Sequence, residues 1–420
     1  MVSGLSALTG FFYGQNSINK IVICCVFGVF LSSVNSEANW VWNATPDIPA
    51  YDNRWQRFES LWAAHWEGEN IDAMLDLIAQ LETDYPDKID PVLWMGKLSA
   101  LKGKYLKKEG AHYFKQAESY AQKAYQIDPE NIIAFKILLD VLPYIGDKDY
   151  ALSAHGDWIK RAAPLQTGYV VPPMTGNKDW EEAISLWNDR AGEKFDEITQ
   201  KGLDAITKFN DLAEKNPRDI LANSWACRVN YDTGQYYTSV GKHEKKGFAY
   251  YHDSLKYGNR AIALNQYFLP ARYWSTLSQA RLIQEKSILT KARYVNYMMA
   301  NGLFGLREDS LYNYYGHALA LATIITNGGW AAEKGISLAG VEIESLINQL
   351  WLAHLVYPTK LYALYGLADL YFYVGEENKS QEVLDMIFSS DMDQDQSLKL
   401  ENRGVIRFSR KIQEKINLKK

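Results

Sequence analysis

The sequence predicts an all-α protein, an α/α superhelix made of tetratricopeptide-like helix-turn-helix repeats. Apolar residues recur at helical spacing along most of the chain, and no alternation typical of a strand persists for more than a few residues. Turn signals return at regular intervals, because four prolines stand 43 to 44 residues apart: Pro86, Pro129, Pro173 and Pro217. One such repeat cannot bury its own apolar face, so we expect the repeats to stack against one another.

The first 36 residues have the pattern of a signal peptide. An uninterrupted apolar run, Ile21 to Leu31, follows Lys20 and precedes small residues that end at Ser36, where we expect cleavage. The run is shorter than the roughly 20 residues that cross a bilayer, and a membrane anchor or a buried helix is the alternative. Both cysteines of this segment lie inside the run and not at its end, so it carries no lipidation motif. The segment 1–36 therefore predicts a protein that is periplasmic or otherwise exported.

Residues 37–170 are expected to form a cap and the N-terminal helical repeats. The cap, Asn39 to Ala64, is rich in aromatic residues: Trp40, Trp42, Tyr51, Trp55 and Trp62. Repeats are expected at 54–81, at 91–129 and at 131–164, with breaks near residues 68–70 and at Gly146. In the second repeat the small residues and the closing proline occur at tetratricopeptide offsets: Ala117, Ala121, Ala124 and Pro129.

Residues 171–420 are expected to continue the same helical array. A junction at Tyr169–Lys178 precedes a long helix over 179–209, capped by Asp179, and a further helix over 220–233. The clearest repeat lies at 357–387, with Gly375 between its two helices. The large, small and aromatic positions of the tetratricopeptide pattern fall at Leu364, Leu367, Ala368, Tyr371, Ser380, Leu384 and Ile387.

From Asp179 onward the chain resembles the T-component family of TRAP transporters, which are periplasmic helical proteins with tetratricopeptide-like repeats. Four stretches carry the resemblance: Ala261 to Ala280 with its Tyr273-Trp274 pair, Tyr312 to Ala320, the repeat at Tyr357 to Ile387, and Glu401-Asn402. The resemblance implies a binding protein that works beside an extracytoplasmic solute-binding protein. It also implies self-association into a trimer. A general tetratricopeptide-like envelope scaffold is the alternative function.

The composition excludes several other classes of protein. A formal net charge of −5 argues against a nucleic-acid partner. No histidine pair has metal-ligand spacing, and no phosphate loop, dinucleotide fingerprint or nucleophile elbow occurs, so we expect no metal, no cofactor and no enzyme activity. A secreted helical enzyme that cleaves polysaccharides would need paired carboxylates, for which the candidates are Asp179, Glu181, Glu182, Glu308 and Asp309. Their places at helix starts are explained by capping instead.

Aromatic residues are the strongest functional signal, since they make up 13% of the chain. Rings and polar groups alternate around Tyr312–His317, and no charged residue occurs between Leu311 and Glu333, so this helix should be enclosed on most sides. Core packing is one explanation. The other is a surface for a small amphipathic ligand or a protein partner. The candidate ligand- or partner-binding residues are Tyr273, Trp274, Tyr314, Tyr315 and His317.

Overall fold

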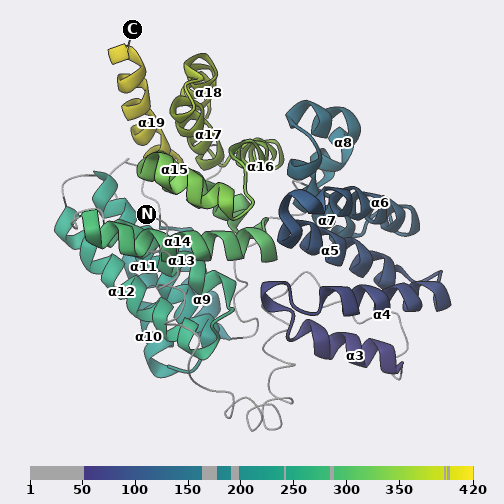
Figure 1. Ribbon diagram of the computed structural model, residues 1–420. Coiled ribbons are helices and arrows are strands. Elements are labelled where there is room, and N and C mark those ends of the chain that lie inside the picture. Colours follow the sequence, from purple (N-terminus) through teal and green to yellow (C-terminus); the bar gives the residue numbers. More distant parts are fainter. Residues whose placement is uncertain are drawn as a thin grey trace, which may run out of the picture. The chain divides into compact units, whose positions relative to one another are not determined.

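The computed structural model confirms the all-α prediction. It describes residues 52–162, 177–190, 198–240, 243–283, 288–391, 394 and 398–419, which all belong to one compact unit, Pro46–Lys420. Within these ranges the chain forms 17 α-helices and two short 3-10 helices, and it contains no β-strand (Figure 1). None of the helices in the described ranges is both long enough and apolar enough to span a bilayer. The predicted signal peptide lies outside the described residues.

The three N-terminal repeats are present as helix pairs. Each helix packs against the next one along the chain, as expected for stacked antiparallel pairs (Figure 1). The small residues of the second repeat are fully buried where α5 and α6 cross: Ala117, Ala121 and Ala124. The helices are α3 (Asn53–Trp62), α4 (Ile71–Asp84), α5 (Ile89–Leu106), α6 (Ala111–Ile127), α7 (Ile132–Ile145) and α8 (Lys148–Ala162), with 3-10 helices η1 (Trp66–Gly68) and η2 (Lys107–Gly110).

Aromatic packing joins the cap to the second repeat. The rings of Phe58 and Trp62 in α3 meet the Trp94 ring of α5, with centroid distances of 4.6 and 4.8 Å. Both contacts are edge-to-face, the geometry that the ring quadrupoles favour. The described part of the predicted cap thus packs on the second repeat. Trp40, Trp42 and Tyr51 lie outside the described residues.

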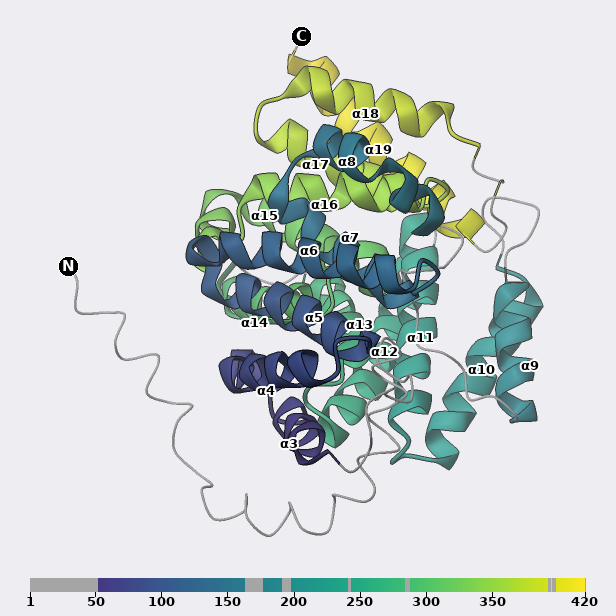
Figure 2. The same ribbon diagram turned by 90° about the vertical axis from the view of Figure 1, so that its right-hand side faces the viewer.

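The C-terminal part contains eleven further helices within the described ranges. Neighbours in sequence again pack side by side, most extensively α11 with α12 and α12 with α13. Figure 2 shows α9 and α10 lying together as a pair. The bounds are α9 (Lys178–Asn188), α10 (Gln200–Lys215), α11 (Ile220–Val240), α12 (Glu244–Leu264), α13 (Leu269–Leu282), α14 (Ile288–Glu308), α15 (Tyr312–Leu338), α16 (Ile343–Val356), α17 (Tyr362–Tyr373), α18 (Glu377–Ser389) and α19 (Lys399–Lys419).

The prediction of one long helix over 179–209 is wrong, because α9 ends at Asn188 and α10 begins at Gln200. Thr199 starts the second helix, since its side-chain oxygen accepts a hydrogen bond from the backbone N–H of Gly202 at 3.2 Å. The N-cap of α9 also lies two residues earlier than predicted. The Asn177 side chain, not that of Asp179, accepts from the Asp179 N–H at 3.0 Å.

The repeat at 357–387 is present as the pair α17 and α18, and six of its seven pattern positions are buried, whereas Tyr371 is half-buried. Gly375 has a φ of +84° and separates α17 from α18, a conformation that glycine adopts without steric cost. Ala368 is fully buried, and the Ser380 hydroxyl of α18 donates to its backbone oxygen across the pair at 2.8 Å. Small residues therefore stand where these two helices approach closely. Cys227, the cysteine of the described ranges, is a buried core residue as expected, and burial raises the pKa of its thiol to about 12.

Helix α15 begins with an uncommon backbone conformation. Three consecutive residues that are not glycine have positive φ values: Asn313 (49°), Tyr314 (58°) and Tyr315 (60°). The left-handed conformation costs a residue with a Cβ roughly 1–2 kcal/mol. Most residues over 312–322 are buried, as the absence of charges predicts, whereas Trp330 in the second half is 74% exposed. Strain of this kind is retained where the surrounding structure over-determines it, often at binding sites.

Candidate functional site

A cavity of about 930 Å³ lies between the helices α9, α11, α13, α15, α17 and α19. Its wall combines aromatic rings with charged groups. The rings come mainly from α11 and α13, including Trp225, Tyr231, Tyr273 and Trp274. Six arginines or lysines and four aspartates or glutamates line it, so the cavity is mixed in charge and not strongly of one sign. Such a volume lies within the range that small-molecule sites occupy.

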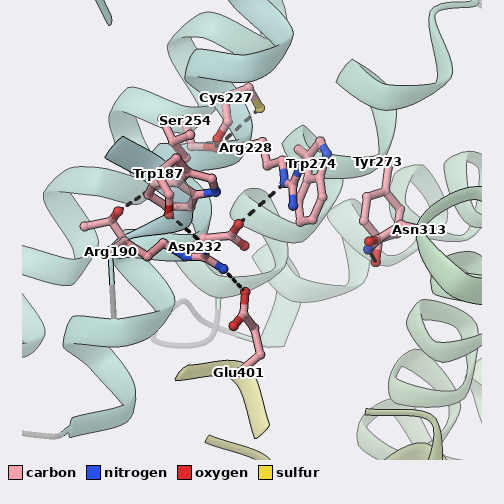
Figure 3. A network of polar contacts seen from close by, with 12 residues as sticks. Trp187, Arg190, Cys227, Arg228, Asp232, Ser254, Tyr273, Trp274, Asn313 and Glu401 are labelled. Atoms are coloured by element: carbon pink, nitrogen blue, oxygen red, sulfur yellow. Dashed lines mark hydrogen bonds and ion pairs between the residues drawn. The ribbon is translucent and has the colours of Figure 1, made fainter. Parts of the chain in front are cut away.

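Two ion pairs stand next to each other in this cavity. The Nη2 atom of Arg190 donates to Oε1 of Glu401 at 2.6 Å, which ties the end of α9 to α19. The Nε atom of Arg228 lies 3.6 Å from Oδ2 of Asp232, one turn along α11. Figure 3 shows Asp232 and Glu401 pointing toward the same region. Four charges of alternating sign are thereby brought together from three helices.

The two ion pairs differ in the distance between their charged atoms. The Arg190–Glu401 distance is that of a strong charge-assisted hydrogen bond. The Arg228–Asp232 distance is too long for a hydrogen bond. Among the described residues, no hydrogen bond reaches either side chain of this second pair, although each is only about one sixth exposed, at 16% and 17%. Arg228 and Asp232 therefore keep hydrogen-bonding capacity that the described protein does not use.

Aromatic rings fix the position of the open pair. The guanidinium carbon of Arg228 lies 4.9 Å from the Trp225 ring centroid and 5.5 Å from that of Trp274. The Trp274 indole N–H in turn donates to the Tyr312 hydroxyl at 3.0 Å. A guanidinium held against two indoles is oriented before any ligand arrives.

The environment of Asp232 disfavours its charge. Burial is the main cause that raises the pKa of this carboxyl to about 6. The Glu401 carboxylate acts in the same direction, and the Arg228 and Arg190 guanidinium groups oppose it. A carboxyl whose pKa is displaced toward neutrality in a cleft is a candidate functional group. In this cavity it would favour a proton or a cationic partner.

The left-handed turn at the start of α15 contributes to the same wall. The Asn313 amide donates to the Tyr273 hydroxyl at 3.0 Å and accepts from the Lys360 ammonium at 3.2 Å. That ammonium also lies 3.7 Å from the centroid of the Tyr314 ring. The strained turn therefore presents one amide and one ring to the cavity and holds Lys360 beside them.

The five residues predicted from the sequence fall into two groups. Tyr273, Trp274 and Tyr314 line the cavity together. Tyr315 and His317 are not among the described residues that line it, since both are buried in the protein beside it. The His317 ring packs edge-on against Tyr273 with a centroid distance of 5.0 Å, and burial lowers the pKa of its imidazole to about 3. Whether any of the five contacts a ligand stays a prediction.

Sequence reasoning missed the charged residues of the site. Arg228 and Asp232 are spaced four residues apart within the apolar stretch SWACRVNYD, so both could have been marked as charges on a buried helix face. Arg190 and Glu401 carry no such local signal, because they are 211 residues apart. In the described ranges, no group of three or more His, Cys, Asp or Glu side chains is placed to hold a metal ion.

Comparison with known proteins identifies no family. No protein-family model matches the chain, and no curated protein matches it. Among solved structures, a crystal structure of yeast Tom70 aligns over 93% of this chain and 95% of its own, with 13% identity and a TM-score of 0.20. A score this low does not establish a shared fold.

Proposed function

We propose that this protein is an exported helical-repeat binding protein that holds a small amphipathic ligand in the cavity between α9–α13 and α15–α19. Following its resemblance to the TRAP transporter T-component family, we further propose that it works in the periplasm beside a solute-binding protein. It acts there as an accessory protein of a TRAP-type transport system and not as an enzyme. The same resemblance suggests a homotrimer.

The observation that carries the ligand-binding part is the cavity itself. Its volume of about 930 Å³ exceeds that of the voids left by imperfect packing, and its lining joins indole and phenol rings to fixed charges. An amphipathic ligand matches both features, because its apolar body covers rings while its polar end meets the charged groups. The strained turn at Asn313–Tyr315 supports this role, since strain is commonly retained at ligand sites.

The ligand-binding part is tested with anilinonaphthalene sulfonate, an amphipathic dye that fluoresces in apolar surroundings. The dye should bind the purified protein, and Leu319→Trp, which fills the cavity lining on α15, should weaken that binding at least about tenfold. Leu338→Trp is the matched control, because Leu338 is 71% exposed on the same helix and does not belong to the lining. Equal binding by all three proteins would reject the cavity as the site.

The transport part is tested separately. Purified protein should co-migrate in size-exclusion chromatography with a periplasmic solute-binding protein from the same organism. The fraction isolated from the envelope should begin at Glu37 or a near neighbour when its N-terminus is read by mass spectrometry. Recovery of residues 1–36 in a membrane fraction would reject export by cleavage.

A general envelope scaffold is the second candidate, and one observation favours it. Trp330 is 74% exposed on α15, directly after Gly329, whose φ is +63°. Exposed tryptophans are enriched in protein–protein contacts. If Trp330→Ser abolishes association with a partner while dye binding in the cavity is unchanged, the scaffold function is favoured over ligand binding.

A further inference from the structure

The open pair formed by Arg228 and Asp232 specifies a ligand more closely than the cavity as a whole does. Both side chains line the cavity, and the described residues offer neither of them a hydrogen bond. A guanidinium has five donors and a carboxylate about four acceptor sites. Taking both groups largely out of water without satisfying them is costly, and a ligand that supplies the missing partners recovers that cost.

The two other arginines that line the cavity each donate a hydrogen bond to a protein side chain. Arg190 donates to the Glu401 carboxylate at 2.6 Å, and Arg281 donates to the Gln235 side chain at 2.9 Å. Of the three arginines that line the cavity, Arg228 alone has no hydrogen bond within the described part of the chain. Its guanidinium is nevertheless held in place by the Trp225 and Trp274 rings. It is therefore oriented but not satisfied.

Ligands with a single charge suit this pair poorly. An anion on Arg228 would approach the Asp232 carboxylate, with Glu401 nearby, and like charges at this range repel. A cation on Asp232 would approach Arg228 and meet the same penalty. A head group that carries both charges on the same carbon atom satisfies both side chains and is repelled by neither.

We propose that Arg228 and Asp232 form a subsite for a zwitterionic α-amino-acid head group, with the ligand carboxylate on Arg228 and its ammonium on Asp232. The apolar or aromatic body of the ligand then lies along the rings of Tyr231, Tyr273 and Trp274, which line the same cavity. This inference rests on the proposed ligand-binding function and adds the chemical class of the ligand.

Three probes with the same aromatic body test the subsite: phenylalanine, phenylpropionate, which lacks the ammonium, and phenylethylamine, which lacks the carboxylate. Isothermal titration of the purified full chain at about pH 7 should give phenylalanine at least about tenfold higher affinity than either of the others. Equal binding of phenylpropionate would reassign the pair as an anion site. Equal binding of phenylethylamine would reassign it as a cation site.

Two variants should change the affinities for the two singly charged probes in different ways. Asp232→Asn should weaken phenylalanine and strengthen phenylpropionate, because the repulsion of the acid is removed. Arg228→Met, which keeps the stem against the indoles, should weaken phenylalanine and strengthen phenylethylamine. Lys160→Met is the control, because Lys160 is 82% exposed on α8 and does not belong to the lining, so the order of the three probes should stay unchanged.

The zwitterion subsite and the cavity can fail independently. If none of the three probes binds while anilinonaphthalene sulfonate still does, the head-group class is wrong and the cavity remains a binding site. If the dye fails as well, the proposed function falls with it. Thermal melting of each variant shows whether it is folded, and the comparison of the three probes on the unchanged protein needs no variant at all.

Discussion

The Tyr315 hydroxyl donates a hydrogen bond to the backbone carbonyl of Leu139, 3.0 Å away in α7. In a regular helix this carbonyl would accept from the N–H four residues later, but that residue is Pro143, which has no N–H. The tyrosine therefore supplies the donor that the proline removes. Because Tyr315 follows directly on Asn313 and Tyr314, this bond also holds the strained turn beside the cavity.

Removing that hydroxyl should destabilise the fold. Tyr315→Phe leaves the Leu139 carbonyl buried without a donor, and we expect the free energy of unfolding in urea to fall by about 1–3 kcal/mol. Tyr365→Phe is the matched control, because the Tyr365 hydroxyl makes no hydrogen bond within the described residues and should be near neutral.

A double-mutant cycle tests the stated reason. In a Pro143→Ala background the alanine N–H can reach the Leu139 carbonyl, so Tyr315→Phe should cost clearly less there than in the unchanged protein. An equal cost in both backgrounds would mean that the hydroxyl acts in some other way.

The helical fold could be predicted because its signals are local. Ala121 and Ala368 stand at small-residue positions of the repeat, and both are fully buried at helix crossings. The left-handed turn could not be predicted in this way. Asn313, Tyr314 and Tyr315 have no local preference for three successive positive φ values, and the turn depends on distant partners such as Leu139 and Lys360.

In the candidate site, too, only the residues with a local sequence signal could be predicted. Tyr273, Trp274 and Tyr314 were found because aromatic clustering is visible in the sequence, and they do line the cavity. The charges that give the cavity its chemistry were missed. The Arg190–Glu401 pair depends on α9 and α19 meeting in space, which no short-range pattern encodes. Tyr315 and His317 lie in the same aromatic cluster but face away from the lining.

Enlarging a small residue at a helix crossing should overpack it. Ala368 and Ala121 have no exposed surface, so Ala368→Leu and Ala121→Leu should each lower the free energy of unfolding by about 1–3 kcal/mol. Ala111→Leu, at an exposed position of α6, serves as the control and should change little. Unchanged thermal melting of Ala368→Leu would contradict the assigned register of this repeat.

A buried ion pair joins α5 to α7 and to the turn before α15. The Lys104 ammonium donates to Asp140 at 2.5 Å and to the Arg307 carbonyl at 3.2 Å, and the Ser310 hydroxyl also donates to Asp140. Lys104→Met leaves a buried carboxylate without its cation and should cost about 3–5 kcal/mol of unfolding free energy. Adding Asp140→Asn should recover part of that loss, because the amide oxygen can still accept from Ser310.

An exposed pair provides the comparison for this prediction. Lys256 and Glu214 lie 2.7 Å apart, but their side chains are 51% and 45% exposed. Lys256→Met should therefore cost less than about 1 kcal/mol in the same urea titration. A cost for Lys104→Met no greater than that of Lys256→Met would show that the buried pair contributes little.

His317 should make the fold sensitive to mild acid. Burial and the nearby Arg272 guanidinium lower the pKa of its imidazole to about 3, whereas an unfolded histidine titrates near 6.5. Between these values the unfolded chain binds more protons, so the free energy of unfolding falls as the pH decreases. His317→Gln should remove about 1–2 kcal/mol of that loss between pH 7 and pH 5. If the free energy of unfolding falls equally with pH in both proteins, His317 is protonated in the folded state as readily as in the unfolded chain, which contradicts the prediction.

Binding of phenylalanine should weaken as the pH falls through about 6. Only the ionised Asp232 carboxylate attracts the ligand ammonium, and burial raises the pKa of this carboxyl to about 6 in the unliganded protein. The charged groups that face it are Glu401, which raises the pKa, and Arg228, Arg190 and Lys360, which lower it.

The measurement is the dissociation constant for phenylalanine at several pH values between about 5 and 8. Above pH 6 it should be constant, and below pH 6 it should rise toward about tenfold per pH unit, because a proton must leave before the ammonium can bind. Asp232→Asn should give weaker binding with no pH dependence over this range. His317 titrates in the unfolded chain alone over the same interval, so melting curves recorded at each pH separate lost folding from lost affinity. A pH dependence that persists in Asp232→Asn would assign the titrating group elsewhere and remove Asp232 from the ammonium contact.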